Sequence, residues 1–294
     1  MTIYNLGSIN ADHFYQVPHL PRPGETLAAH AFSSGLGGKG INQSVAAALA
    51  GSRVVHIGAV GPDGQWTVER IAEFGVDTRH IQTVETPTGH AIINVDTNGE
   101  NAIVIFPGAN NCQSVAHIEH VLGSADKGDI LLLQNETTLQ AEAAKIAHGR
   151  GLKVIYSAAP FSVAAVKNVM EYVSILMMNH IESEQLCAGL ETDLAGLPVP
   201  EIIVTKGANG AMWLQPETGE TGNTPSVPVK PVDTTAAGDT FAGYIAAGLD
   251  QGQNMQHAMR WASAAAALKV TRNGAADAIP SAAEVANFLT ANGL

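Results

Sequence analysis

Two glycine-rich segments of the 294-residue sequence carry the charged side chains best placed for chemistry. The first, residues 35–40, reads Gly-Leu-Gly-Gly-Lys-Gly, and its Lys39 stands where a helix is expected to begin. Glycines let a backbone approach a ligand closely, and the open N–H groups of a helix N-terminus attract anions. The segment therefore suits a polyhydroxylated or anionic ligand. A tight loop with a solvated lysine is the alternative.

Residues 35–40 also match the G-x-G-x-x-G pattern of dinucleotide-binding proteins, but their surroundings do not. That motif directly follows a first strand and has an acidic residue about 20 positions later. Here a proline-rich stretch precedes the glycines, and the residues near 55–60 are apolar. Lys39 is followed by glycine rather than by serine or threonine, so the segment is not a nucleotide P-loop either. A dinucleotide-dependent dehydrogenase is therefore not expected.

The second segment, residues 233–243, reads DTTAAGDTFAG and precedes a long predicted helix. Its small residues leave backbone N–H groups open at the helix N-terminus, which favours binding of a phosphoryl group. Asp239 lies in the same turn, where its carboxylate could accept a proton from an attacking hydroxyl. Acidic residues also occur in first turns because they stabilise the helix. The motif alone leaves both roles open.

The composition argues against several classes of function. Hydrophobic residues make up 46% of the chain and charged residues 14%, which is typical of a folded globular protein. The 27 acidic and 15 basic residues give a net charge of −12, which disfavours nucleic acid or a membrane surface as a partner. Two cysteines, Cys112 and Cys187, predict no disulfide framework. The first residues lack the features of a signal peptide, and we expect a cytoplasmic protein.

Strand and helix patterns alternate along most of the chain, which predicts a mostly parallel sheet. Strands are expected at 3–6, 54–60, 130–133, 153–156, 173–178 and 202–205, and helices at 38–50, 66–74, 139–148, 181–190, 236–249, 255–270 and after Ser281. Two stretches interrupt this order: residues 12–34 with three prolines, and residues 88–106 with a hairpin pattern around Asn98-Gly99. We expect one domain, residues 1–294, with a small β appendage built from these two inserts.

Five motifs, taken in order, resemble those of the PfkB-type carbohydrate kinases, and among them the ribokinase group. They are residues 7–12 (GSINAD), 37–42 (GGKGIN), 179–182 (NHIE), 205–210 (TKGANG) and 233–243. The resemblance implies a three-layer α/β/α sandwich with a mostly parallel central sheet, and a β-sheet lid formed by residues 12–34 and 88–106. It also implies an ATP- and Mg²⁺-dependent sugar kinase that phosphorylates the 5-hydroxyl of D-ribose and pairs as a homodimer through the lid.

The resemblance assigns roles to individual residues, with Asp239 as the base that activates the sugar hydroxyl. The expected sugar contacts are Asn10, Asp12, Gly38, Lys39, Asn42, Glu136 and Asp239. The expected ATP site and anion hole are Asn179, Thr205, Lys206, Gly207, Ala208, Asn209, Gly210, Ala236, Ala237, Gly238 and Ser263. Glu182 would organise Mg²⁺ through water. A monovalent cation, K⁺ among the possibilities, would be bound mostly by backbone oxygens of Asp233, Thr235, Lys269, Arg272, Gly274 and Ala278.

The chain departs from the patterns of this family at four places: residues 157–160 (SAAP), Ala242, Ser263 and Ala278. Ala278 lacks the hydroxyl often found at the end of the cation loop, which puts activation by a monovalent ion in doubt. Two alternatives stay open. One is a related kinase for a nucleoside, fructose or a keto-sugar acid. The other is a catalytically silent sugar-binding protein, against which the retention of Lys39 and Asp239 argues.

Overall fold

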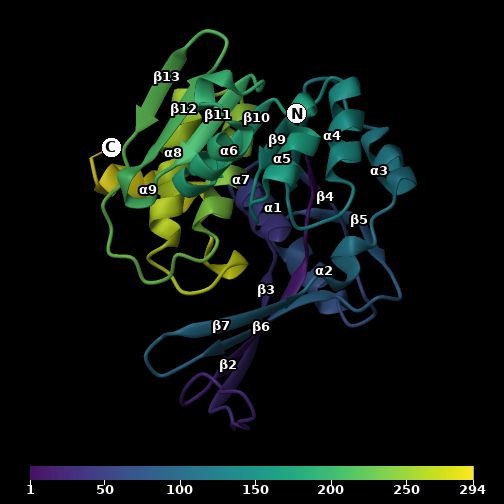
Figure 1. The fold of residues 1–294 in the computed structure, drawn as a ribbon, viewed down its shortest axis with the longest axis vertical. Helices are drawn as coiled ribbons and strands as arrows, with labels where there is room; N and C mark the ends of the chain where they lie inside the picture. The colour runs from purple at the N-terminus through teal and green to yellow at the C-terminus, as the bar shows by residue number, and fades with distance from the viewer. Residues whose placement is uncertain (294) are drawn as a thin grey trace.

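The computed structural model describes residues 1–293, and it contains a large and a small β-sheet (Figure 1). The large sheet has nine strands in the order β13-β12-β11-β10-β9-β8-β1-β4-β5. Their bounds are β1 (Ile3–Leu6), β4 (Val54–Val60), β5 (Asp77–Thr83), β8 (Ile130–Gln134), β9 (Lys153–Ser157), β10 (Ile175–Asn179), β11 (Glu201–Thr205), β12 (Ala211–Gln215) and β13 (Glu220–Thr224). All neighbours pair in parallel except at one edge, where β12 runs antiparallel to β11 and to β13.

The residues of the central strands alternate between two buried layers, as the period of two in a strand requires. In β1, Ile3 faces one hydrophobic cluster, whereas Tyr4 and Leu6 face the other. The first layer holds α1 (Lys39–Leu49), α2 (Gln65–Glu73), α7 (Ala237–Asp250), α8 (Met255–Lys269) and α9 (Ala282–Ala291). The second holds α3 (Val115–Leu122), α4 (Gln140–Gly149), α5 (Val163–Val169) and α6 (His180–Leu190). The predicted three-layer α/β/α sandwich is confirmed.

The small sheet projects from one end of the molecule, at the bottom of the view in Figure 1. Its order is β3 (Ala31–Gly37), β2 (Asn10–Gln16), β6 (Gly89–Val95) and β7 (Asn101–Phe106). The predicted hairpin is confirmed as the antiparallel pair β6–β7, while β2 and β6 pair in parallel. Because β2 starts shortly after β1 ends and β3 runs into α1, the junction of the two sheets brings the motifs at 7–12 and 35–42 together.

Sequence patterns missed three strands of the large sheet, and two of them are polar. Neither β5 (DTRHIQT) nor β13 (ETGNT) has an apolar run, and β12 is the short strand that pairs with β13. Strands β5 and β13 are the two edges of the large sheet, where burial is lower and backbone pairing decides the conformation. The apolar β12 (AMWLQ) lies next to the edge, and three of its five residues are buried. Within residues 1–293, no helix is long and apolar enough to cross a membrane.

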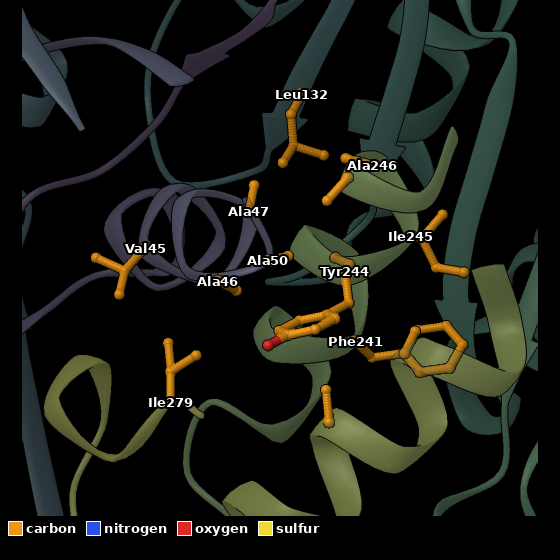
Figure 2. Packing of buried hydrophobic residues seen from close by; sticks show 14 of the residues in the cluster. Val45, Ala46, Ala47, Ala50, Leu132, Phe241, Tyr244, Ile245, Ala246 and Ile279 are labelled. Atoms are coloured by element: carbon orange, nitrogen blue, oxygen red, sulfur yellow. The ribbon is translucent and has the colours of Figure 1, made fainter. Parts of the chain in front are cut away.

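Helices α1 and α7 pack closely, and their contact positions the first turn of each (Figure 2). Small side chains line the contact, including Ala46 and Ala47 of α1 and Ala246 of α7. Gly243 permits the shortest approach, because a Cβ there would lie 2.5 Å from Ala46 Cβ and 2.6 Å from Gln43 O. No real side chain fits at such distances without displacing one helix.

Gly243→Ala is therefore expected to destabilise the protein by about 1–3 kcal/mol, the usual cost of overpacking a core. The matched control is Gly149→Ala at the end of α4, where a Cβ would have no atom within 4 Å. Higher helix propensity should leave that variant neutral or up to about 1 kcal/mol more stable. Urea unfolding measures both changes. Equal stability of the two variants would contradict the packing argument.

Candidate active site

Asp239 lies in the first turn of α7, where that helix meets the N-terminal end of α1. Its side chain is buried, with 6% of the residue exposed. Oδ2 accepts a hydrogen bond from Asn42 Nδ2, and Oδ1 accepts one from Gln43 Nε2, both at 3.1 Å. Two consecutive side-chain amides thus hold the carboxylate in one orientation. The role of Gln43 was not predicted, since nothing in a sequence marks one polar helix residue as facing a carboxylate 196 positions away.

Gln43 begins a buried chain of hydrogen bonds that leads away from Asp239. Its Oε1 accepts a hydrogen bond from Gln134 Nε2 at 2.8 Å, and the same nitrogen donates to Asn5 Oδ1 at 2.8 Å. Gln43, Gln134 and Asn5 have no exposed surface. Buried amides of this kind must be paired, and each pairing fixes which way the next amide points. The hydrogen bond from Gln134, which is itself held by Asn5, therefore fixes the orientation of Gln43.

The chain ends at His56, which is fully buried in β4. Asn5 Nδ2 donates to Ser44 Oγ, and Ser44 Oγ lies 2.9 Å from His56 Nδ1. His56 Nε2 faces the carbonyl oxygen of Gly7 at 3.2 Å, so Nε2 carries the proton and Nδ1 accepts from the Ser44 hydroxyl. Burial lowers the pKa of His56 to about 4. The imidazole is therefore neutral, and the whole chain carries no charge.

A second carboxylate, Glu136, is held beside Lys39. Glu136 Oε2 accepts hydrogen bonds from Ser8 Oγ and from the backbone N–H of Lys39. The Asp239 carboxylate raises the pKa of Lys39 above its ordinary value, burial opposes this shift, and Glu136 adds to it. Gly40 makes the approach possible, because a Cβ there would collide with the backbone of Ser8. The structure thus brings together Lys39, Glu136 and Asp239, as predicted.

Asn10 and Asp12 of β2 complete the polar cluster. Asn10 Oδ1 accepts a hydrogen bond from Asn110 Nδ2 at 2.8 Å, and Asn110 is itself paired with the backbone N–H and carbonyl of Ile9. Asn110, from the short helix η1 (Gly108–Asn111), was not predicted to take part. Burial, together with the nearby Glu136 carboxylate, raises the pKa of Asp12 to about 7.

Asn42 offers the cluster an acceptor that nothing in the described residues occupies. Its Nδ2 is used by Asp239, but Oδ1 is buried and has no hydrogen-bond partner within residues 1–293. A buried polar atom without a partner is costly unless a ligand satisfies it. The cluster of Asn10, Asp12, Lys39, Asn42 and Glu136 therefore has the mix of donors and acceptors that sugar hydroxyls need.

A pocket of about 570 Å³ opens beside the N-terminus of α7. The predicted nucleotide residues on its walls are Thr205, Gly207, Ala208, Gly210, Ala237, Gly238 and Ser263. Apolar side chains that were not predicted, among them Val227, Val229 and Phe241, line much of the rest. Such a largely apolar pocket suits a flat aromatic base. Asn179, Lys206, Asn209 and Ala236 do not line it.

The predicted anion hole is rearranged in detail. Ala236 has a left-handed backbone (φ +57°), and the N–H of Ala237 donates to Thr234 O at 3.2 Å. Helix α7 has no side-chain cap, so the N–H groups of Ala236, Gly238 and Asp239 have no acceptor within residues 1–293 and are open to a ligand. Of the three residues expected in the anion hole, Ala236 and Gly238 thus keep an open N–H group, whereas the N–H of Ala237 is already bonded.

Asn179 and Glu182 form a capping box at the start of α6. Asn179 Oδ1 accepts the N–H of Glu182, and Glu182 Oε2 accepts the N–H of Asn179. The Glu182 carboxylate also raises the pKa of Lys39, after Asp239 and Glu136. Both residues therefore have a structural role, and Oε1 of Glu182 accepts no hydrogen bond within residues 1–293.

Three of the residues predicted to bind a monovalent cation, Thr235, Lys269 and Gly274, contact Asp233. Oδ1 of Asp233 accepts the N–H of Thr235, and Oδ2 accepts the N–H of Gly274. Although burial acts in the opposite direction, these hydrogen bonds lower the pKa of Asp233 below its usual value. The carboxylate is thus ionised and already bound by the backbone.

Comparison with known proteins gives consistent matches over the whole chain. Residues 2–282 match the sequence family described as pfkB family carbohydrate kinase. A ribokinase from Haemophilus influenzae is 35% identical over 303 residues, covering 98% of both chains. A deoxyribokinase from Salmonella typhi is 32% identical over 312 residues, covering 99% of this chain and 100% of the relative. The structure of an Arabidopsis thaliana ribokinase complexed with ribose and ATP has a TM-score of 0.86 at 27% identity, covering 98% of both chains.

Asp12→Asn is expected to stabilise the unliganded protein, and to do so more at pH 8 than at pH 5. The pKa of Asp12, about 7, lies above the value of about 3.9 for an unfolded aspartate, so ionisation destabilises the fold as the pH rises through this range. Removing the carboxyl should raise the free energy of unfolding by about 2–4 kcal/mol at pH 8, measured by urea unfolding. Asp63, whose pKa is lowered by hydrogen bonds from Thr88 despite burial, is the control. Asp63→Asn should lose stability at pH 8, and equal shifts in both variants would contradict the account.

Proposed function

The chain belongs to the pfkB family of carbohydrate kinases, and we propose that it transfers the γ-phosphoryl group of ATP to the 5-hydroxyl of D-ribose. One observation carries the proposal: the Asp239 carboxylate lies at an open helix N-terminus, between a polar cluster and an apolar pocket. The names of the relatives support it, since they include ribokinases and a ribokinase complexed with ribose and ATP.

The polar cluster would bind the sugar and orient the hydroxyl that reacts. Asn10, Asp12 and Glu136 accept hydrogen bonds from hydroxyl groups, and Asn42 Oδ1 gains the partner that it lacks without ligand. Gly38 and Lys39 add backbone and ammonium donors. Phosphoryl transfer depends mainly on such positioning and on charge stabilisation, so a rigid cluster suits the reaction.

Asp239 would act as the general base. Its carboxylate takes the proton of the 5-hydroxyl as the hydroxyl oxygen forms a bond to the γ-phosphorus and the bond to the ADP oxygen breaks. The amides of Asn42 and Gln43 aim the carboxylate at the hydroxyl. The ammonium of Lys39 and the N–H groups of Gly238 and Asp239 stabilise the negative charge on the transferred group.

The pocket beside α7 would hold the adenosine part of ATP, with Ser263 among its polar wall residues. Thr205, Gly207, Ala208 and Gly210 also line it. Mg²⁺ fits the residues present, because it prefers one or two carboxylates and several waters, and Glu182 Oε1 is left for a bound water. When bound, Mg²⁺ neutralises charge on the phosphates. The resemblance would place a monovalent cation near Asp233, but the Lys269 ammonium already lies there.

The small sheet would serve as a lid. Residues 12–34 and 88–106 supply Asp12 to the sugar site and carry the strands that project beyond it. Closure of such a lid would exclude water from the reacting groups. A cytoplasmic location, expected from the sequence, belongs to the same proposal.

The lid would also pair two copies of the chain. Strand β7 is an edge strand that is exposed along its whole length, with Ile103, Val104 and Ile105 at 52%, 64% and 59%. Phe32 and Phe106 on the same sheet are exposed at 57% and 42%. Unpaired apolar edge strands favour association, and a second copy of this sheet would bury them.

Substrate class separates the proposal from its rivals. ADP release from Mg·ATP is measured with D-ribose, fructose, a ketogluconate and nucleosides. Preference for D-ribose supports the pentose assignment, whereas preference for another member keeps the mechanism and changes the substrate. Sugar binding without turnover on any of them would favour the silent sugar-binding protein.

Asp239→Asn is expected to slow turnover with D-ribose by roughly 10²–10⁴-fold, the usual contribution of a positioned base. The amide keeps the shape of the carboxylate, so calorimetry should find ADP affinity changed by less than about threefold, a difference of roughly 0.7 kcal/mol. Asp250→Asn, at the opposite end of the same helix, is the control and should retain normal turnover. Near-normal turnover in Asp239→Asn would refute the role of the base.

Val104→Glu is expected to weaken dimerisation, because it places a charge in the centre of the proposed apolar interface. Sedimentation analysis should find a dimer for the wild type and a shift toward monomer for the variant. Val115→Glu, at an exposed site on α3, is the matched control and should leave the dimer intact. A monomeric wild type, or a variant dimer of unchanged affinity, would rule out pairing through the lid.

A further inference from the structure

Lys269, the last residue of α8, is a buried cation behind the loop that leads into α7. The residue has no exposed surface, and Nζ donates a hydrogen bond to the carbonyl oxygen of Asp233 at 3.1 Å. Withdrawing an ammonium group from water is costly unless polar or charged partners compensate. The ionised Asp233 provides that compensation, and the ammonium of Lys269 therefore lies against the loop that contains Asp233.

The Asp233 loop is tied to the end of α8 at several points. The N–H groups of Val232 and Asp233 both donate to Val270 O, and the N–H of Gly274 donates to Asp233 Oδ2. Asp233 Oδ1 accepts the N–H of Thr235. The ammonium takes the third oxygen of Asp233, the carbonyl. Every oxygen of Asp233 therefore accepts a hydrogen bond, and these bonds hold the loop against the end of α8.

The Asp233 loop directly precedes the turn that presents the open N–H groups. Three residues after Asp233, Ala236 adopts the left-handed conformation, which a residue with a side chain holds only when its surroundings enforce it. Thr240 donates to Ala236 O through both its N–H and its hydroxyl. The contacts that hold the Asp233 loop therefore also help to position the N–H groups of Gly238 and Asp239.

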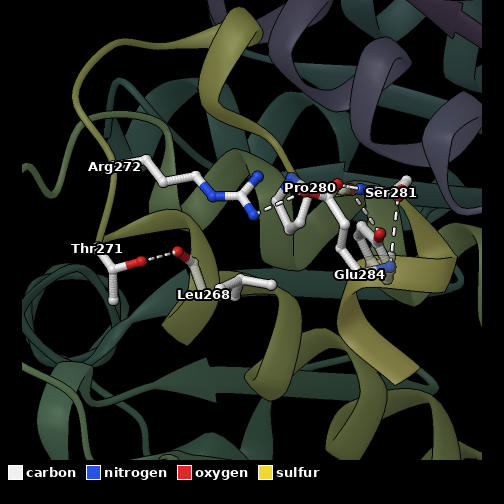
Figure 3. A network of polar contacts seen from close by, with 7 residues as sticks. Leu268, Thr271, Arg272, Pro280, Ser281 and Glu284 are labelled. Atoms are coloured by element: carbon white, nitrogen blue, oxygen red, sulfur yellow. Dashed lines mark hydrogen bonds and ion pairs between the residues drawn. The ribbon is translucent and has the colours of Figure 1, made fainter. Parts of the chain in front are cut away.

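The neighbouring cation, Arg272, points elsewhere. Figure 3 shows its guanidinium extended toward Glu284 of α9, with Nη2 2.8 Å from Oε1. Glu284 also caps α9 through Ser281. Arg272 is thereby neutralised at the surface of the 269–278 segment. Among the described residues of that segment, Lys269 is the cation that contacts the Asp233 loop.

The monovalent cation implied by the family resemblance does not fit these residues. Each oxygen of Asp233 already accepts a hydrogen bond, and the carbonyl of Lys269 accepts the N–H of Arg272 at 3.0 Å, so a cation would have to share these oxygens with their donors. Ala278, in the short helix η5 (Ala276–Ala278), offers a methyl group where a hydroxyl would be needed. A K⁺ ion placed here would also meet an ammonium of like charge, which disfavours its binding.

We propose that the Lys269 ammonium replaces the monovalent cation, so that the anion-binding turn of this chain is organised without K⁺. The proposal rests on the proposed kinase function, because it concerns the site that would bind the ATP phosphates. Lys269 is a positioning residue: it touches neither substrate, and it acts through the Asp233 loop. A lysine fixed by the chain supplies its charge at any ionic composition, whereas a bound ion must be captured from solution.

The first test uses the wild-type protein in matched tetramethylammonium and potassium buffers. Turnover with Mg·ATP and D-ribose, and the ADP affinity measured by calorimetry, should each change by less than about twofold, roughly 0.4 kcal/mol. A rise of tenfold or more in either quantity on adding K⁺ would overturn the proposal. The ADP measurement needs no sugar, so it decides the matter even if D-ribose is not the substrate and the proposed function fails.

The second test removes the charge. Lys269→Met keeps most of the length of the side chain and removes its charge. The variant is expected to lower kcat/KM for ATP by roughly tenfold or more in tetramethylammonium, as loss of an electrostatic stabiliser does. K⁺ or methylammonium should restore part of that loss and should tighten ADP binding, because either can supply the missing charge. Lys145→Met on the surface of α4 is the matched control and should behave as the wild type does.

A purely structural lysine would give a different result. Lys269→Met would then lose thermal stability and activity equally in both buffers, and no cation would restore ADP affinity. If Lys269→Met does not fold, Lys269→Arg keeps a charge and should remain independent of K⁺. Dependence of that variant or of the wild type on K⁺ would contradict the inference.

Discussion

The contact between the first turns of α1 and α7 is the constraint on which the rest of the site depends. It is short because Gly243 lets the helices approach, and it places the amides of Asn42 and Gln43 on the two oxygens of Asp239. A carboxylate that accepts a hydrogen bond on each oxygen cannot rotate freely. Behind Gln43, the uncharged buried chain to His56 fixes the amide in turn. Packing and hydrogen bonding therefore act together in orienting one group.

Local charge resolves an apparent conflict between the composition and the proposed function. The chain carries a net charge of −12, yet the proposed ligand, ATP, is a polyanion. Lys39 faces the carboxylates of Asp239 and Glu136, the α7 N-terminus presents open N–H groups, and Lys269 lies buried behind the adjoining loop. Fixed charges and dipoles of this kind act over short distances, where the net charge of the surface is screened. Phosphates bound beside α7 would therefore meet local cations and N–H donors, although the chain as a whole is acidic.

Sequence patterns predicted the mostly parallel sheet and the hairpin of the small sheet, because hydrophobic periodicity and turn signals are local. The family resemblance implied the three-layer sandwich and the residues that cluster around Asp239. Sequence patterns missed the polar edge strands, such as β13, whose conformation depends on pairing. They also missed Gln43 and Asn110, which act through partners 196 and 100 residues away. Lys269 was expected to contribute a backbone oxygen. The direction of its side chain is set by the packing of α8, which no spacing rule reports.

A crystal structure with D-ribose and a non-hydrolysable ATP analogue tests the central claim most directly. The account predicts that the ribose 5-hydroxyl oxygen lies within hydrogen-bond distance of Asp239, about 2.6–3.2 Å, with the γ-phosphate on the N–H groups of Gly238 and Asp239. Asn42 and Gln43 should keep their hydrogen bonds to the Asp239 carboxylate. A bound sugar whose 5-hydroxyl points away from Asp239, with another group beside it, would contradict the account.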